Sequence, residues 1–211
     1  LAFDTPSIWS PCSQSSKVTV WKTYVDILKG SGTDGMPCIK AVTVLDRSPS
    51  ECFELFRDDK RVSEYNDNCR ELEDVARISS PPDGEVKVNW CATGRFGPFE
   101  RRDFTTVVRN EAVDGGEGGY LSVATAIEME GYGGLGRRKG YVRSRIVLSA
   151  SFMKPVEGEG GKCEFWQLTK VGELGGVANN RVARRLQDKL LEKAPIDFLE
   201  RFGKAVVKKK N

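Results

Sequence analysis

The sequence predicts an α+β fold in which a strongly curved antiparallel β-sheet wraps around one long C-terminal α-helix. Three observations predict it. Apolar residues alternate with a period of two through the middle of the chain, glycine-rich turns separate these segments, and residues 177–207 carry an apolar stripe with helical spacing. Such spacing favours an antiparallel meander over βαβ units. A length of 211 residues suits one large domain with its own core.

The N-terminal part is expected to begin with an irregular arm over residues 1–16, and residues 17–211 are expected to form a single domain. Strands are predicted at residues 17–28 and 39–45. A helix is predicted to follow, because Ser48 can cap its free amides, Pro49 fits its first turn and Glu51 can complete a capping box. A second short helical segment is expected near residues 58–64.

The following segments alternate as strands do, and the last is a helix. In the strand predicted at residues 85–93, Val86, Val88, Trp90 and Ala92 face one way, and Lys87, Asn89, Cys91 and Thr93 face the other. Pro195 lies inside the closing helix and is expected to kink or divide it. The predicted ranges are 85–93, 101–109, 120–129, 141–153 and 163–170 for the strands, and 177–207 for the helix.

Composition excludes several classes of protein. The chain has no histidine, so catalytic triads and His-based zinc sites that need an imidazole are excluded. Its six cysteines form no CxxC pair, which favours reduced, structural thiols over a zinc site. Net charge is only +3 and no apolar run reaches the length of a membrane span, so we expect a soluble protein that binds no nucleic acid. The cytoplasm is the expected compartment, or an organelle such as a plastid if a targeting segment preceded Leu1.

Many candidate inward positions on the sheet carry small side chains. Such residues would leave volume that Leu or Phe would fill, and a mostly apolar cavity with a few polar groups suits a lipid-sized ligand. Tight packing beneath the closing helix is the alternative, and the pattern alone leaves both open. These positions are Ala92, Thr106, Ser122, Ala124, Ala126, Ser144, Ser149 and Ser151.

A family resemblance rests on motifs that occur in order along the chain. They are the Glu51-Cys-Phe-Glu-Leu-Phe stretch, Tyr65-Asn-Asp, Trp90, Arg102-Asp103-Phe104, Gly175-Gly176 and Pro195-Ile-Asp-Phe-Leu. From about residue 21 to residue 210 the chain resembles a START domain, the StAR-related lipid-transfer family with its helix-grip fold, and the phosphatidylcholine-transfer branch in particular.

The resemblance implies a non-enzymatic protein that carries one lipid in an apolar tunnel, with access gated by the C-terminal helix and adjacent loops. Two other functions remain open: an enzyme of the related polyketide-cyclase type, and a lipid-gated adaptor. Arg102 and Asp103 are expected to support the sheet rather than touch the ligand. The expected lining residues are Trp90, Ala92, Phe104, Thr106, Ser122, Ala124, Tyr65, Asn66, Trp166, Val182, Leu186 and Leu190.

The chain departs from the family where phosphatidylcholine binders hold a headgroup. Tyr65-Asn66 replaces the usual Trp-Asp, and Val62 stands where those members have Arg. Some sterol- and ceramide-binding members carry an acidic residue where this chain has Asn89 or Cys91. This chain is therefore expected to lack the buried ion pair that would anchor a phosphocholine headgroup. Loss of both partners together is physically coherent, because either charge left buried alone would be costly. We then expect the ligand to be held by shape and by hydroxyl or amide contacts. The candidate ligands are a phospholipid, a sterol, another glycerolipid or a pigment.

Positive charge gathers at the C-terminus, where residues 177–211 hold ten basic and four acidic side chains. This basic helix is expected to contact an anionic membrane transiently, and a solvated outer face is the alternative. Gly131, Gly133 and Gly136 match a GxGxxG pattern but lead into a strand, so a hairpin loop is expected, not a nucleotide site. No cofactor or metal is expected, and the protein is expected to be a monomer. Candidate membrane contacts are Arg137, Arg138, Lys139, Arg184, Arg185 and Lys189.

Overall fold

A computed structural model describes residues 8–24, 36–80, 84–95, 100–127, 138–172 and 181–208. Along the chain the elements are β1 (Ser10–Gln14), β2 (Val18–Thr23), β3 (Cys38–Leu45), α1 (Pro49–Phe56), the 3₁₀ helix η3 (Asp59–Glu64), β4 (Glu71–Ser79), β5 (Glu85–Ala92), β6 (Arg102–Val113), the 3₁₀ turn η4 (Asp114–Gly116), β7 (Gly119–Ala126), β8 (Val142–Arg143), β9 (Ile146–Pro155), β10 (Cys163–Val171) and α2 (Arg181–Val207). Within α2 the side chains of residue 185 and of residues 188–207 are described.

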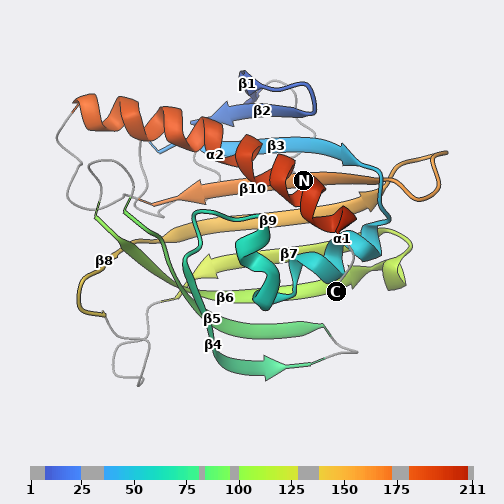
Figure 1. Cartoon of the computed structure of the whole chain (residues 1–211), viewed down its shortest axis with the longest axis horizontal. Coiled ribbons are helices and arrows are strands. Elements are labelled where there is room, and N and C mark those ends of the chain that lie inside the picture. The colour runs from blue at the N-terminus through green and yellow to red at the C-terminus, as the bar shows by residue number, and fades with distance from the viewer. Residues whose placement is uncertain are drawn as a thin grey trace.

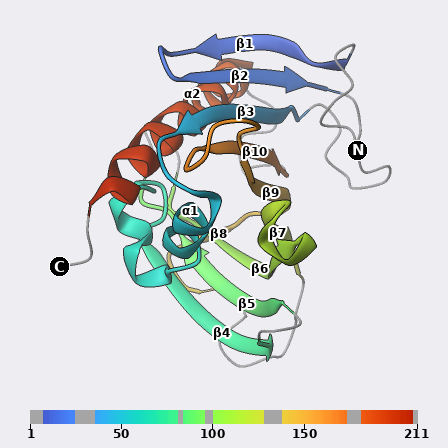
Figure 2. The same ribbon diagram turned by 90° about the vertical axis from the view of Figure 1, so that its right-hand side faces the viewer.

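The strands form one sheet in the order β1-β2-β3-β10-β9-β7-β6-β5-β4, and β8 pairs in parallel with β6 (Figure 1). All neighbours along that order are antiparallel. Figure 2 shows that the sheet curls and that α1 and α2 lie on its open, concave side. The predicted curved antiparallel sheet with a closing C-terminal helix is confirmed.

Helix α1 begins where the sequence predicts it. The Ser48 hydroxyl accepts a hydrogen bond from the Glu51 amide at 3.3 Å, and the Glu51 carboxylate accepts one from the Ser48 amide at 3.0 Å. Pro49 occupies the first turn, where its missing N–H costs nothing. The helix buries Phe53 and Leu55 against the sheet. The predicted second helical segment forms as η3.

Helix α2 is anchored through its C-terminal half. Leu199, Phe202 and Ala205 are buried in the main core, where the Phe202 ring packs edge-on against Phe165 and Tyr65 at centroid distances of 5.0 Å. Pro195 does not divide the helix, which runs unbroken from Arg181 to Val207. No described helix has an apolar stretch long enough to cross a membrane.

Three expectations about the strands are wrong in detail. Ser10–Gln14 form β1, so the arm is not wholly irregular; Pro11 is tolerated because β1 is an edge strand with a bulge. Glu71–Ser79 form an unpredicted edge strand, β4, whose charged, mostly exposed residues lack clear alternation. The single strand expected at 141–153 is two strands, because β8 pairs with β6 before β9 starts.

Candidate functional site

Two adjoining cavities lie between the concave face of the sheet and the helices that cover it. The one beneath α1 and η3, which we call the polar chamber, has a volume of about 190 Å³. The one beneath α2, which we call the apolar chamber, has a volume of about 300 Å³. A single water needs only about 10–15 Å³, so the interior is hollow. The chambers adjoin because they share the lining residues Asn66, Ser149, Gln167 and Phe198.

Strand register places four polar side chains of the polar chamber in one line across the sheet. Asn110 pairs with Ser122, Ser122 with Ser151, and Ser151 with Gln167, on strands β6, β7, β9 and β10. Neighbouring strands lie about 4.7–4.9 Å apart, so each side chain is adjacent to the next. We call these four residues the polar row. One row further along, Val108, Ala124 and Ser149 are too short to fill the space above the sheet.

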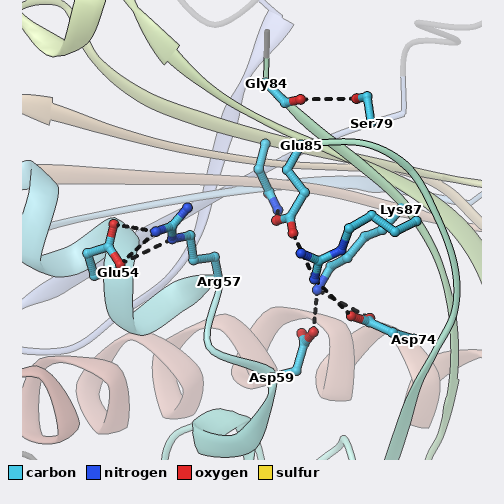
Figure 3. A network of polar contacts seen from close by, with 10 residues as sticks. Glu54, Arg57, Asp59, Asp74, Ser79, Gly84, Glu85 and Lys87 are labelled. Carbon is cyan, nitrogen blue, oxygen red and sulfur yellow. Dashed lines mark hydrogen bonds and ion pairs between the residues drawn. The ribbon is translucent and has the colours of Figure 1, made fainter. Parts of the chain in front are cut away.

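An ionic network forms one wall of the polar chamber (Figure 3). The Lys87 ammonium is almost completely buried and is bound by the Asp59 carboxylate of η3 and by the Asp74 carboxylate of β4, the latter at 3.3 Å. Behind it, Arg77 contacts the buried Glu85 carboxylate at 3.2 Å. The network ties η3 to the outer strands of the sheet and holds Lys87 in place.

Asn110 is positioned by this network. Its side-chain nitrogen donates a hydrogen bond of 2.8 Å to Glu85 Oε2, and both side chains are buried. The amide oxygen of Asn110, and that of Asn89 on β5, are buried without a hydrogen-bond partner among the described residues. Both residues line the polar chamber, so its wall contains these two buried acceptors.

The apolar chamber is walled by strands and roofed by α2. Ile39, Phe104, Ile146 and Val171 contribute apolar side chains from β3, β6, β9 and β10. The roof consists of Leu191, Ala194, Pro195 and Phe198. The two chambers together offer an elongated ligand an apolar end and a polar end.

Six of the predicted lining residues lie at the chambers: Tyr65, Asn66, Ala92, Phe104, Ser122 and Ala124. Thr106 and Leu190 line neither chamber. The side chains of Val182 and Leu186 lie outside the described residues. Lys87, Asn110 and Gln167 were not predicted. Asn110 faces the same side of β6 as Phe104. Extending the predicted strand one residue beyond 109, with the same alternation, would have placed Asn110 on the inner face.

Trp90 lies on the opposite face of the sheet from the chambers, and its predicted role as a lining residue is wrong. Its indole nitrogen donates to Asp103 Oδ2 at 3.0 Å, the Arg138 guanidinium lies 3.6 Å from its ring centroid, and Tyr141 packs edge-on. The residues of β5 that line the chambers are Lys87, Asn89, Cys91 and, at the end of the strand, Ala92. Trp90 faces outward because the segment at residues 138–143 covers its ring.

Trp166 also lies on the outer face. Its ring is 5.5 Å from the Lys40 ammonium, which lies 4.8 Å from each of the Trp9 and Trp21 rings. Trp166 therefore belongs to a cation–π cluster on the convex side and lines neither chamber. The neighbouring inward position on β10 is Gln167.

Arg102 and Asp103 support the sheet, as expected. Asp103 accepts hydrogen bonds from Arg143 at 2.9 and 2.7 Å as well as from Trp90. Burial raises the pKa of the Asp103 carboxyl, but these hydrogen bonds outweigh it and leave the pKa below its usual value. Arg102 donates to the Ser144 hydroxyl at 3.3 Å, so both residues fix the segment that covers Trp90.

The candidate membrane-contact residues have different surroundings. Lys139, Arg185 and Lys189 are exposed. Arg138 is half-buried over Trp90 and pairs with Glu73 at 2.7 Å, so it is already engaged. Arg137 and the Arg184 side chain lie outside the described residues, as do the Gly131 loop and the Gly175-Gly176 junction.

Within the described ranges, no cluster of three His, Cys, Asp or Glu side chains could hold a metal ion. All six cysteines carry free thiols. Burial raises the pKa of the Cys38 thiol to about 12, so it stays protonated at neutral pH.

Comparison with solved structures identifies the fold. Human StAR-related lipid transfer protein 5 has a TM-score of 0.76 at 18% identity, over 97% of this chain and 88% of that chain. Human STARD10 has a TM-score of 0.75 at 16% identity, over 97% of this chain and 75% of that chain. The Zhui aromatase/cyclase from a Streptomyces species has a TM-score of 0.51 at 8% identity, over 81% of this chain and 93% of that chain.

No protein-family model and no curated protein sequence matches the chain. At these identities the structural similarity shows the fold, and the chain has the helix-grip fold of START domains. The nearer resemblance to the phosphatidylcholine-transfer branch stays a prediction.

Proposed function

We propose that this protein binds one lipid molecule in the joined chambers and transfers it between membranes without altering it chemically. The observation that carries the proposal is the hollow interior, in which a chamber lined largely by apolar residues meets a chamber whose lining includes amides, hydroxyls and charged side chains. An amphipathic molecule matches that arrangement, because its chains lose contact with water while its polar end keeps hydrogen bonds. The fold is shared with proteins named for lipid transfer.

Access in this proposal is through movement of the first half of α2. The C-terminal half is fixed by Leu199 and Phe202 in the core, and Phe198 of the roof stacks on the Phe202 ring, whereas Leu191 and Ala194 of the roof lie before them. Lys22 of β2 donates a hydrogen bond of 2.7 Å to Glu192, and both side chains are partly exposed. This ion pair can open at modest cost, since water solvates both partners.

The exposed cations of α2 favour opening of the moving segment at a membrane, because anionic headgroups attract them. Arg185 and Lys189 lie on the same part of the helix, before Leu191. Each cation near an anionic bilayer contributes up to about 1 kcal/mol. Binding of this face to anionic headgroups would bring the roof of the apolar chamber next to the lipid that it receives.

The test is extraction of lipid from vesicles. Purified protein is incubated with vesicles of mixed phospholipids, sterol and diacylglycerol, separated from them and weighed by native mass spectrometry. One lipid per chain is expected. Ser149→Phe places a ring where the chambers meet and should abolish uptake, whereas Val44→Phe adds the same ring at an exposed position and should not. Absence of lipid in the native protein would overturn the proposal.

The competing function is an enzyme acting on an apolar molecule, which the fold shared with the Zhui aromatase/cyclase brings into consideration. The same experiment separates the two functions. A carrier returns the extracted lipid with its mass unchanged after prolonged incubation, whereas an enzyme returns a product of different mass or connectivity.

A further inference from the structure

The orientation of one buried amide determines what the polar row offers a ligand. Glu85 is a carboxylate and can only accept, so the nitrogen of the Asn110 amide must face it, as the 2.8 Å hydrogen bond requires. The Asn110 oxygen therefore faces the other way. Asn110 is 4% exposed and lines the polar chamber, and its oxygen has no partner among the described residues. An occupant must supply a donor there, because an unmet buried acceptor is costly.

The charges around the polar chamber disfavour a phosphate. Of the described residues that line it, Arg57 and Lys87 are cationic. Arg57 pairs with Glu54 at 2.9 Å, and Lys87 is bound by both Asp59 and Asp74. In the network of Figure 3 the carboxylates of Asp59, Asp74 and Glu85 outnumber the cations of Arg77 and Lys87. A phosphodiester would bring another negative charge beside these carboxylates, and both cationic side chains among the described lining residues are already paired.

We propose that the polar row binds the hydroxyl group of an uncharged lipid, which donates its hydrogen bond to Asn110 Oδ1. The inference rests on the proposed function and names the chemical class of its ligand. Ser122 lies next to Asn110 along the row, and Ser151 lies on the far side of Ser122, so the Ser122 hydroxyl is the nearer second partner for the hydroxyl group of the ligand. The apolar body of the ligand passes between Ser149 and Phe198 into the apolar chamber. Sterols and diacylglycerols both carry this chemistry.

The experiment compares each alcohol with its methyl ether, which has nearly the same shape but no donor. One set of phosphatidylcholine vesicles contains equal amounts of cholesterol and cholesterol methyl ether. Another contains diacylglycerol and its 3-O-methyl ether. Lipid extracted by the native protein is quantified by mass spectrometry. The alcohol should exceed its ether by about tenfold or more in at least one set, since a buried acceptor left unmet rejects the ether. The set that shows this preference identifies the source of the hydroxyl.

Two variants test the role of Asn110. Asn110→Leu removes the acceptor and should reduce the preference to less than about twofold. Glu85→Gln keeps a hydrogen-bonding residue that can still contact Arg77, but it lets Asn110 turn over, because Gln can donate to the Asn110 oxygen. This variant should lose the preference while still extracting lipid. Arg109→Gln, the adjacent outward-facing position, is the control and should keep the native ratio.

The outcomes separate this inference from the function on which it rests. Equal extraction of alcohol and ether by the native protein, or extraction of phosphatidylcholine alone, overturns the role of the polar row and leaves the carrier intact. A native preference that persists in both Asn110→Leu and Glu85→Gln also overturns it. If the native protein extracts no lipid of any class, the proposed function itself fails.

Discussion

Replacing Lys87 tests how the ionic wall of the polar chamber is stabilised. The Lys87 side chain is 3% exposed, whereas those of Asp59 and Asp74 are 32% and 34% exposed. Lys87→Met leaves two carboxylates that water can still solvate, so we expect unfolding free energy to fall by about 1–2 kcal/mol. The double variant Asp59→Asn, Asp74→Asn leaves a buried ammonium without a counter-charge and should cost about 3–5 kcal/mol.

Urea unfolding at pH 7, followed by circular dichroism, measures both values. In a chain of this size each kcal/mol also lowers the melting temperature by about 2–4 °C, so heating distinguishes the variants independently. Arg57→Met, which breaks a more exposed pair with Glu54, is the control and should cost less than about 1 kcal/mol. If Lys87→Met were as destabilising as the double variant, burial of the cation would not explain the network.

Three further predictions concern Asp103, Trp90 and the ion pair of Lys22 with Glu192. Because the folded protein lowers the pKa of Asp103, this carboxylate contributes stability that is present above its unfolded pKa of about 3.9 and is lost as pH falls through the folded pKa. The destabilisation caused by Asp103→Asn should therefore be constant above about pH 5 and shrink below about pH 4 in urea unfolding curves. Trp90→Phe removes the donor to Asp103 and should cost about 1–3 kcal/mol while leaving lipid extraction unchanged, because the ring faces away from the chambers. Lys22→Gln should change stability by less than about 1 kcal/mol but speed transfer of radiolabelled lipid between vesicles, because it releases Glu192.

Each of these predictions can fail separately. A pH-independent cost of Asp103→Asn would show that the carboxylate does not titrate as its hydrogen bonds require. Loss of lipid extraction in Trp90→Phe, with the fold intact, would return Trp90 to the ligand site. A transfer rate unaffected by Lys22→Gln would place the rate-limiting motion elsewhere in the molecule.

Features set by neighbouring residues were predictable from the sequence. The start of α1 follows from Ser48, Pro49 and Glu51, because capping depends on groups within one helical turn. The strand β4 was missed since its charges protect a sheet edge, and a charged edge strand has no apolar face to reveal it. Local chemistry therefore predicts where a helix begins better than it predicts which segment forms the edge strand of a sheet.

The chambers depend on contacts between distant segments, and here sequence reasoning was only partly right. Small residues such as Ala124 and Ser149 indicated a hollow, which the structure contains. The phase of β5 was inverted, because Val88 and Trp90 are apolar and were expected to face inward. A segment about fifty residues later, at 138–143, covers the Trp90 ring on the outer face. The role of Asn110 required the register that places it opposite Glu85.

All four tryptophans of the chain lie away from the chambers: Trp9, Trp21 and Trp166 surround the Lys40 ammonium, and Trp90 lies beneath Arg138. Intrinsic fluorescence will therefore report loss of the outer face on unfolding but will change little when the interior fills. A ligand titration followed by tryptophan emission would therefore show little change even at full occupancy, so the fluorescent label must be on the lipid.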